Sequence, residues 1–272
     1  MMPKVIPGLD AFMVIKNGTR LGYPWAEAIR AVLPWVEKFW IEEGFGADDT
    51  VTGLETLAHH HANVEVSYYE WPQLQTGFAI GAATQHLLDR LNRQSTADWL
   101  LYVQADELWP ERSLNWIAKI FEYDQRFDSA AFRFLHLAHN YQELQFPPGQ
   151  ESYTHAIRLI RNNGRIKSHR DAWTFEGAKD TVRAPESIRI AHANSTHWRN
   201  YSLKTRSHAD TLYTDLPHYR VSAEEREREL AEAAEVPELW TRTTSPYAEW
   251  LPECVLPTIG WPEYRAREEL LR

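Results

Sequence analysis

The sequence has few of the features that define several other classes of protein. A single cysteine, Cys254, excludes an internal disulfide. Its place between Pro252 and Pro257, far from any acid-base cluster, makes it a poor nucleophile. The longest apolar runs, such as Trp99 to Val103, are too short to span a bilayer. The segment Met1 to Asp10 lacks the basic flank and apolar core of a signal peptide. We therefore expect a cytoplasmic protein without an integral membrane segment.

Charge and missing motifs exclude further classes. The 29 Lys and Arg residues are outnumbered by 38 Asp and Glu residues, which gives a net charge of -9. No Lys/Arg block offers the basic face that phosphate backbones need, so no nucleic-acid partner is expected. Gly-x-Gly-x-x-Gly, Gly-x-x-x-x-Gly-Lys-Ser/Thr and Gly-x-Ser-x-Gly are absent, which removes the usual dinucleotide, P-loop and hydrolase signatures. A local basic pocket for a diphosphate remains compatible with the sequence.

Aromatic side chains are abundant, with 12 Trp and 12 Tyr. Aromatic rings suit the apolar C–H faces of sugars, and they suit protein cores equally well. The hydrophobic content of 43% and charged content of 25% are those of an ordinary globular protein. The composition thus indicates a folded domain and only weakly favours a carbohydrate ligand.

Apolar strands and amphipathic helices alternate through the first half of the chain. Strands are expected at 11–15, 39–41, 64–68 and 99–103, and helices at 24–34, 51–60 and 76–92. This alternation predicts an α/β fold in which helices flank a mostly parallel sheet, with the ligand site outside the carboxyl ends of the strands. The polar segments 16–17, 42–43 and 104–107 then share one rim of the sheet.

The second half predicts an α+β extension. Strands are expected at 130–137, 153–160 and 187–190, separated by polar loops, and a charged surface helix at 224–235. We expect a catalytic domain over 1–220, with a nucleotide-binding half at 1–112 and an acceptor and metal half at 113–220. A C-terminal helix and an irregular tail, 221–272, would pack on this domain.

The sharpest local feature is the strand 99–103, which leads into Gln104-Ala105-Asp106-Glu107. Two adjacent carboxylates at a strand end are costly without a partner. A divalent cation, Mg²⁺ or Mn²⁺, that bridges the two phosphates of a nucleotide sugar would supply one. The alternative interpretation is that Asp106 and Glu107 only cap a helix that begins near Pro110.

These motifs, taken in order from Phe12 to Glu111, resemble family 2 glycosyltransferases. Asn17 matches the Asn that follows the first strand, and either Glu42 or Glu43 matches the acidic residue that binds the nucleotide base. Asp48-Asp49-Thr50 matches the turn after it, although this turn is one residue longer. Gln104-x-Asp106 stands in place of Asp-x-Asp. The resemblance implies a GT-A (Rossmann-like) fold and a hexosyltransferase-like, inverting enzyme that uses a nucleotide-diphosphate sugar.

Candidate residues in the second half complete the predicted site. Asp171, or else Glu176, is the candidate general base that deprotonates an acceptor hydroxyl, a task that Asp106 or Glu107 could also perform. A surface ion pair or turn is the alternative role for Asp171. The resemblance implies that His192 joins Asp106 at the metal, and that Arg199 and Lys204 neutralise the diphosphate.

The same residues are also compatible with other functions. A glycoside hydrolase would use Asp106 or Glu107 opposite Asp171 or Glu176. A non-catalytic nucleotide- or carbohydrate-binding protein on the same scaffold would explain Gln104. The run 59–61 consists of three consecutive histidines, which lack metal-ligand spacing and are expected at the surface. Tyr141, Phe146 and Trp173 are candidates for an acceptor wall, or for core packing.

Overall fold

The computed structural model describes residues 5–72, 79–123, 126–137 and 155–193. Arg199, Lys204, Tyr141 and Phe146, together with the predicted segment 221–272, lie outside these residues. Nothing in the structure therefore tests the predictions made for them.

The first half of the chain alternates strands and helices, as the sequence predicts. In order, the elements are β1 (Leu9–Ile15), α1 (Trp25–Val32), the short 3-10 helix η1 (Leu33–Trp35), β2 (Phe39–Glu43), α2 (Thr50–His60), β3 (Val64–Tyr68), α3 (Ala79–Gln94) and β4 (Trp99–Tyr102). Every residue of β1 is buried, which explains its apolar run over 11–15. Pro24 precedes α1, where its missing N–H is of no consequence and its ring favours helix initiation.

The second half contains more short elements than the sequence reveals. It comprises β5 (Glu107–Leu108), α4 (Glu111–Tyr123), β6 (Ser129–Leu137), β7 (His155–Arg161), β8 (Lys167–His169), β9 (Thr174–Glu176), β10 (Thr181–Arg183) and β11 (Arg189–Ala193). The strands β6, β7 and β11 were predicted. The others have only two or three residues each, which is too short for a periodic pattern to show.

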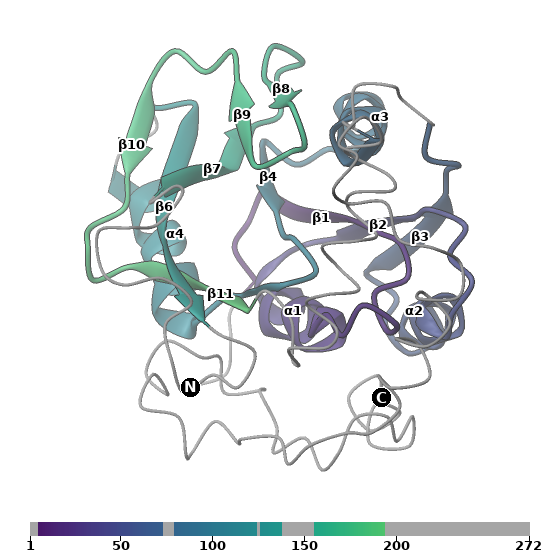
Figure 1. Ribbon diagram of the computed structural model, residues 1–272. Helices are drawn as coiled ribbons and strands as arrows, with labels where there is room; N and C mark the ends of the chain where they lie inside the picture. The colour runs from purple at the N-terminus through teal and green to yellow at the C-terminus, as the bar shows by residue number, and fades with distance from the viewer. Residues whose placement is uncertain (1–4, 73–78, 124–125, 138–154, 194–272) are drawn as a thin grey trace, which may run out of the picture.

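The strands form a mostly parallel sheet in the order β3-β2-β1-β4-β7-β6-β11-β5, with β10 also paired to β6 (Figure 1). The pairs β1–β2, β1–β4 and β2–β3 are parallel, and β7 runs antiparallel between β4 and β6. Ile15 is in register with Glu43, and Glu43 with Tyr68. The carboxyl ends of these strands therefore lie at one edge, and the predicted α/β fold class is confirmed.

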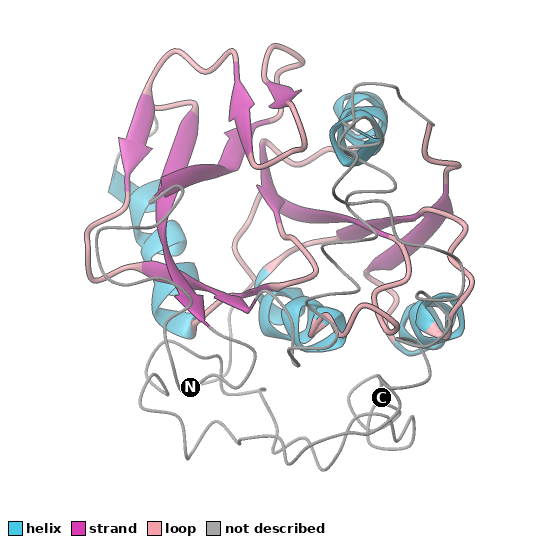
Figure 2. Ribbon diagram, viewed as in Figure 1, coloured by secondary structure: helices cyan, strands magenta, loops and turns pink. Residues whose placement is uncertain are grey.

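Helices cover both faces of this sheet (Figure 2). On one face, Leu54 of α2 packs in the same core cluster as Met13 of β1. On the other face, Leu87 of α3 packs with Phe12. The β8–β9 hairpin lies beside α3, far in sequence from it (Figure 1). None of the helices in the described ranges is long and apolar enough to cross a membrane.

Candidate functional site

Three polar strand ends meet at the carboxyl edge of the sheet. The strand order reverses at β1, because β2 and β3 lie on one side of it and β4 lies on the other. Open α/β sheets bind ligands outside the strand ends at such a switch point. Asn17 follows β1, Glu43 ends β2 and Asp106 follows β4. The structure thus brings together residues from the three segments that the sequence places on one rim.

The loops after β1 and β2 are joined to each other by hydrogen bonds. The side-chain Oδ1 of Asn17 accepts the N–H of Ala47 at 2.7 Å, and Oδ2 of Asp48 accepts the N–H of Arg20 at 2.7 Å. The Thr50 hydroxyl oxygen accepts the N–H of Thr19 at 2.9 Å. Two of the predicted cofactor-binding residues, Asn17 and Asp48, therefore build the rim of the site by tying its loops together.

The structure distinguishes Glu42 from Glu43. Successive side chains of a strand point to opposite faces of the sheet. Glu42 Oε2 lies 3.0 Å from Nδ1 of His86, whose ring stacks on Tyr69 with centroids 3.8 Å apart. Glu43 is fully buried; its Oε1 accepts the N–H of Gly46 at 2.8 Å, and within the described part of the chain its Oε2 has no hydrogen-bond partner. Within the described residues, Glu43 is therefore the carboxylate of the two that has a buried oxygen without a hydrogen-bond partner.

Gly46 is required beside this carboxylate. An added Cβ at Gly46 would lie 2.8 Å from both Oδ1 of Asn17 and Oε1 of Glu43. Any side chain here would thus displace one of the two polar groups that end β1 and β2. The glycine in the turn after β2 keeps the loop backbone close to both.

Glu43→Gln is expected to make the folded protein more stable at neutral pH. Burial raises the pKa of Glu43 above its ordinary value. Between the unfolded and the raised folded pKa, the folded state binds more protons, so stability falls as pH rises through that window. Glutamine removes this penalty and still accepts the Gly46 N–H. Urea unfolding at pH 4 and pH 8 measures the effect, and the gain should appear at pH 8 and vanish toward low pH.

Glu42→Gln is the matched control for this measurement. Glu42 is buried to the same extent but contacts His86 and Ser67. Its replacement is expected to lower stability at pH 8, because the contact with His86 weakens. A Glu43→Gln protein that is less stable than the natural chain at pH 8 would contradict our account of the unpartnered oxygen.

Asp106 and His192 lie together at the end of β4. His192 of β11 places Nε2 3.4 Å from Oδ2 of Asp106, and both side chains are about nine-tenths buried, at 9% and 11% exposure. The N–H of Ala193 donates to the backbone oxygen of Asp106 at 2.8 Å, which fixes the two segments against each other. His136 of β6 lies behind His192, with 3.0 Å between their Nδ1 atoms.

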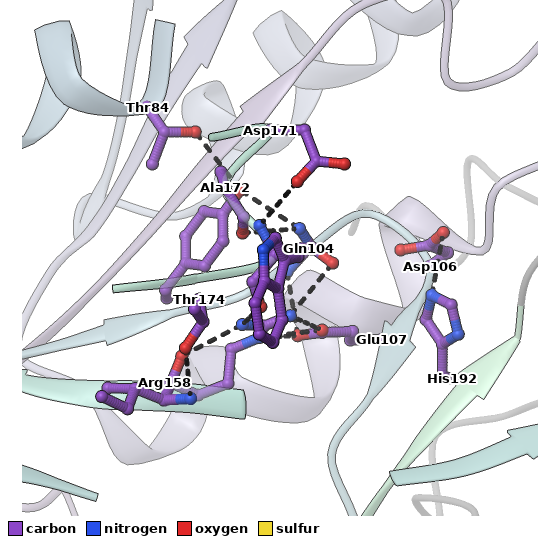
Figure 3. A network of polar contacts seen from close by, with 12 residues as sticks. Thr84, Gln104, Asp106, Glu107, Arg158, Asp171, Ala172, Thr174 and His192 are labelled. Carbon is purple, nitrogen blue, oxygen red and sulfur yellow. Dashed lines mark hydrogen bonds and ion pairs between the residues drawn. The ribbon is translucent and has the colours of Figure 1, made fainter. Parts of the chain in front are cut away.

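Gln104 and Glu107 form a buried network with Arg158 of β7 (Figure 3). Arg158 and Glu107 are both 0% exposed, and the arginine Nη2 and Nε donate to Oε1 at 2.6 Å and 2.8 Å. Arg158 also donates to Oε1 of Gln104 at 3.1 Å. These contacts tie Gln104 and Glu107 to Arg158, whereas Asp106, which is also buried, lies against His192 instead. Glu107 is therefore the buried counter-ion of Arg158.

Asp171 lies in a tight loop that this network holds in place. Gln104 Nε2 donates to the oxygen of Ala172 at 3.2 Å, and Arg158 Nη1 donates to that of Trp173 at 2.8 Å. Oδ1 of Asp171 accepts the N–H of Trp173 at 3.3 Å, a turn contact that leaves the carboxylate half-buried beside Gln104 (Figure 3). The loop therefore delivers Asp171 to the same strand end as Asp106.

Glu176 and Trp173 occupy other surroundings. Glu176 is exposed on β9, and its Oε2 lies 2.8 Å from Nδ1 of His169. This contact joins the two strands of the β8–β9 hairpin. Trp173 is partly buried against the main core cluster. His59 and His60 are exposed at the end of α2, as expected.

The sequence reasoning missed Arg158, His136 and Gly81. Arg158 and His136 interrupt the apolar strands 155–161 and 129–137, and a polar residue in a buried strand signals a buried partner. That signal was available but could not name the partner, because Glu107 lies 51 residues from Arg158. Gly81 in α3 gave no signal beyond being a glycine inside a helix.

Asp106 and His192 carry side chains of the kinds that hold divalent cations in proteins. Such ions commonly take one or two protein ligands and complete their shell with water and phosphate oxygens. A carboxylate oxygen and an imidazole nitrogen only 3.4 Å apart provide two ligands from the protein. No cluster of three or more His, Cys, Asp or Glu side chains suited to a metal occurs in the ranges the structure describes. Two protein ligands would leave the remaining positions of such a cation to water or to a bound ligand.

The sheet order and the flanking helices define the chain as an α/β protein with a mostly parallel sheet. No protein-family model matches it, and no curated protein sequence does. Among solved structures it is similar to S. aureus TarS, at 14% identity and a TM-score of 0.46, over 82% of this chain and 42% of that one. The chain thus spans less than half of that TarS chain.

Two further solved structures are similar to a comparable degree. The mannosyltransferase PcManGT from Pyrobaculum calidifontis, in complex with GDP-Man and Mn²⁺, is 13% identical with a TM-score of 0.45, over 85% of this chain and 71% of that one. A Bacillus anthracis protein assigned as a glucose-1-phosphate thymidylyltransferase is 13% identical with a TM-score of 0.45, over 72% and 94%. These likenesses concern the fold alone, so the function proposed below rests on the chain's own residues.

Proposed function

We propose that this protein is a glycosyltransferase that moves a sugar, with inversion, from a nucleotide-diphosphate sugar to an acceptor hydroxyl. One observation carries the proposal. A buried glutamate with an unpartnered oxygen, Glu43, and the Asp106–His192 pair lie at the ends of β2 and β4, on either side of β1. A nucleotide base and a diphosphate at these two places would span the switch point of the sheet.

Each part of the donor has a matching group in this arrangement. Glu43 Oε2 would accept an N–H from the base, and the joined loops that carry Asn17 and Asp48 would line the nucleoside. Asp106 and His192 would hold a divalent cation against the diphosphate. When bound, that cation neutralises the charge of the departing diphosphate. Arg199 and Lys204, beyond the described residues, are proposed to contact the phosphates.

Asp171 is the proposed general base. An inverting transfer needs a carboxylate on the acceptor side that removes the hydroxyl proton as the oxygen attacks the anomeric carbon. Asp171 is half-buried and held beside Gln104 by the contacts of its loop. Glu107 is fully enclosed with Arg158, and Glu176 pairs with His169 on an exposed hairpin. Asp171 is therefore favoured among the predicted catalytic residues.

The competing functions receive less support from the geometry. A glycoside hydrolase needs two opposed carboxylates. Glu107 is paired with Arg158 and Glu176 contacts His169, so only Asp106 and Asp171 of the four candidates would be left for that chemistry. The absence of a first aspartate at Gln104 favours a non-catalytic binding protein as the second candidate. Gln104 is tied to Arg158 and Ala172, and so contributes no ligand to a metal.

Calorimetric titration of UDP and GDP, with and without Mn²⁺, tests the proposed donor site. One nucleotide is expected to bind in a metal-dependent manner, and Asp106→Ala is expected to weaken that binding at least tenfold, about 1.4 kcal/mol. Glu43→Gln should weaken nucleotide binding with and without metal, because it removes a charged acceptor. Glu176→Gln is the control and should bind normally. Failure of both nucleotides to bind under any condition would overturn the proposal.

A further inference from the structure

Two buried histidines contact each other directly behind the proposed cation site. His136 and His192 are register partners on the parallel strands β6 and β11. Their Nδ1 atoms lie 3.0 Å apart, and their rings are perpendicular. As whole residues, His136, His192 and Asp106 are 4%, 7% and 8% exposed, so the contact is shielded from solvent. The proposed function does not use His136.

The short contact restricts where the two protons of the neutral pair can lie. One Nδ1 must donate and the other must accept, because each neutral imidazole has one N–H and one lone pair. In the first arrangement, His136 donates, and His192 carries its own proton on Nε2, facing Asp106. In the second, His192 donates to His136, and the lone pair of its Nε2 faces Asp106 Oδ2 at 3.4 Å.

A lone pair held against a carboxylate is unfavourable unless a cation lies between them. The first arrangement therefore suits the site without a cation, where Nε2–H points to an anion. The second suits the site with a cation, because both Nε2 and Oδ2 can then act as ligands. The backbone bond from Ala193 to Asp106 holds the two groups in place in both arrangements.

We propose that His136 is a positioning residue that accepts the Nδ1 proton of His192, and so presents the His192 Nε2 lone pair to a divalent cation at Asp106. The inference rests on the proposed function for the cation itself. In the second arrangement the Nδ1 hydrogen bond runs from His192 to His136, so the two arrangements contain the same number of protons on the pair.

Hydrogen bonds of this kind to a ligating imidazole fix its ring orientation and its tautomer, and their loss typically weakens metal binding 10–100-fold. His136 lies on β6, which pairs with the strand β11 that carries His192. On its other side, β11 pairs with β5. The positioning group is therefore part of the rigid sheet and not of a loop.

His136→Asn and His136→Phe form a matched pair of variants. The asparagine carbonyl can still accept the His192 proton, whereas phenylalanine cannot. Mn²⁺ is titrated into each protein in the presence of UDP, and UDP is titrated separately without metal. Phenylalanine is expected to weaken Mn²⁺ binding about 10–100-fold and asparagine to restore it largely. Metal-free UDP binding should stay unchanged in both.

The natural chain provides a second measurement that needs no variant. The ¹⁵N chemical shifts of the His192 ring distinguish a protonated nitrogen from one with a lone pair. The proton is expected on Nε2 in the free protein and on Nδ1 with Mg²⁺ and UDP. The same tautomer in both states, or full Mn²⁺ affinity in His136→Phe, overturns the role of His136 while UDP binding still supports the donor site. Absence of UDP binding to the natural chain overturns the proposed function together with this inference.

Discussion

Arg158→Ala is expected to lower the free energy of unfolding by about 3–5 kcal/mol, because it leaves the Glu107 carboxylate buried without its counter-charge. Both side chains are 0% exposed, and the guanidinium donates to both carboxylate oxygens at distances from 2.6 to 3.0 Å. The same guanidinium also holds Gln104 and the oxygen of Trp173. The loss is expected in chemical denaturation, as a lower midpoint with an unchanged dependence on denaturant.

The double variant Arg158→Met with Glu107→Leu is the control for this prediction. Replacing both members of a buried ion pair by apolar groups of similar volume is often neutral. The double variant should therefore regain most of the stability lost in Arg158→Ala, although Gln104 loses a donor. The activity proposed to depend on Asp171 should fall in both proteins, because the Arg158 contact to the backbone oxygen of Trp173 is gone. A loss below about 1 kcal/mol in Arg158→Ala would show that the charge is solvated or paired in another way.

Gly81→Ala is expected to destabilise the protein by about 2–3 kcal/mol, although the same change inside a helix normally stabilises by about 1 kcal/mol. An added Cβ on Gly81 would lie 1.7 Å from the backbone oxygen of Arg170. The sign reverses because the neighbour is backbone and not a flexible side chain. Arg170 and Ala172 have φ values of 52° and 63°, so the loop is already strained and has little freedom to move away. Thermal unfolding measures the effect.

Arg170→Gly distinguishes the backbone contact from the side chain. This substitution keeps the carbonyl and relieves the positive φ, so alone it is expected to be neutral or stabilising. Combined with Gly81→Ala it should not restore stability, because the clash is with the main chain. Full stability of Gly81→Ala would mean that the loop and α3 can separate, and Asp171 would then lose its defined position.

The parts of the fold that the sequence predicted are those with long periodic patterns. The apolar run of β4 and the spacing of Leu87, Leu88 and Leu91 in α3 are visible without any partner. The two-residue strand β5 exists only because His192 and Ala191 pair with it. Such an element has no pattern of its own, since its formation depends on residues more than 80 positions away.

The candidate site was predictable in position but not in the roles of its residues. Its place at the strand ends follows from the α/β alternation. The choice of Glu43 over Glu42 depended on which of the two side chains faces His86 of α3, which the sequence does not show. Glu107 looked like a second ligand because its neighbour Asp106 is one candidate. Glu107 pairs with Arg158, which lies on the distant strand β7. The position of Glu107 next to Asp106 in the sequence gives no indication of this pairing.

The hydrogen bonds between the loops after β1 and β2 have a consequence for the kinetics of ligand capture. Asn17, Thr19 and Arg20 are already hydrogen-bonded to residues 47–50, so the loops after β1 and β2 are held together before a nucleotide binds. Little chain entropy remains to be lost there on association. Nucleotide encounter at these loops should thus proceed in a single kinetic phase whose rate rises linearly with nucleotide concentration, without a slow step of loop ordering.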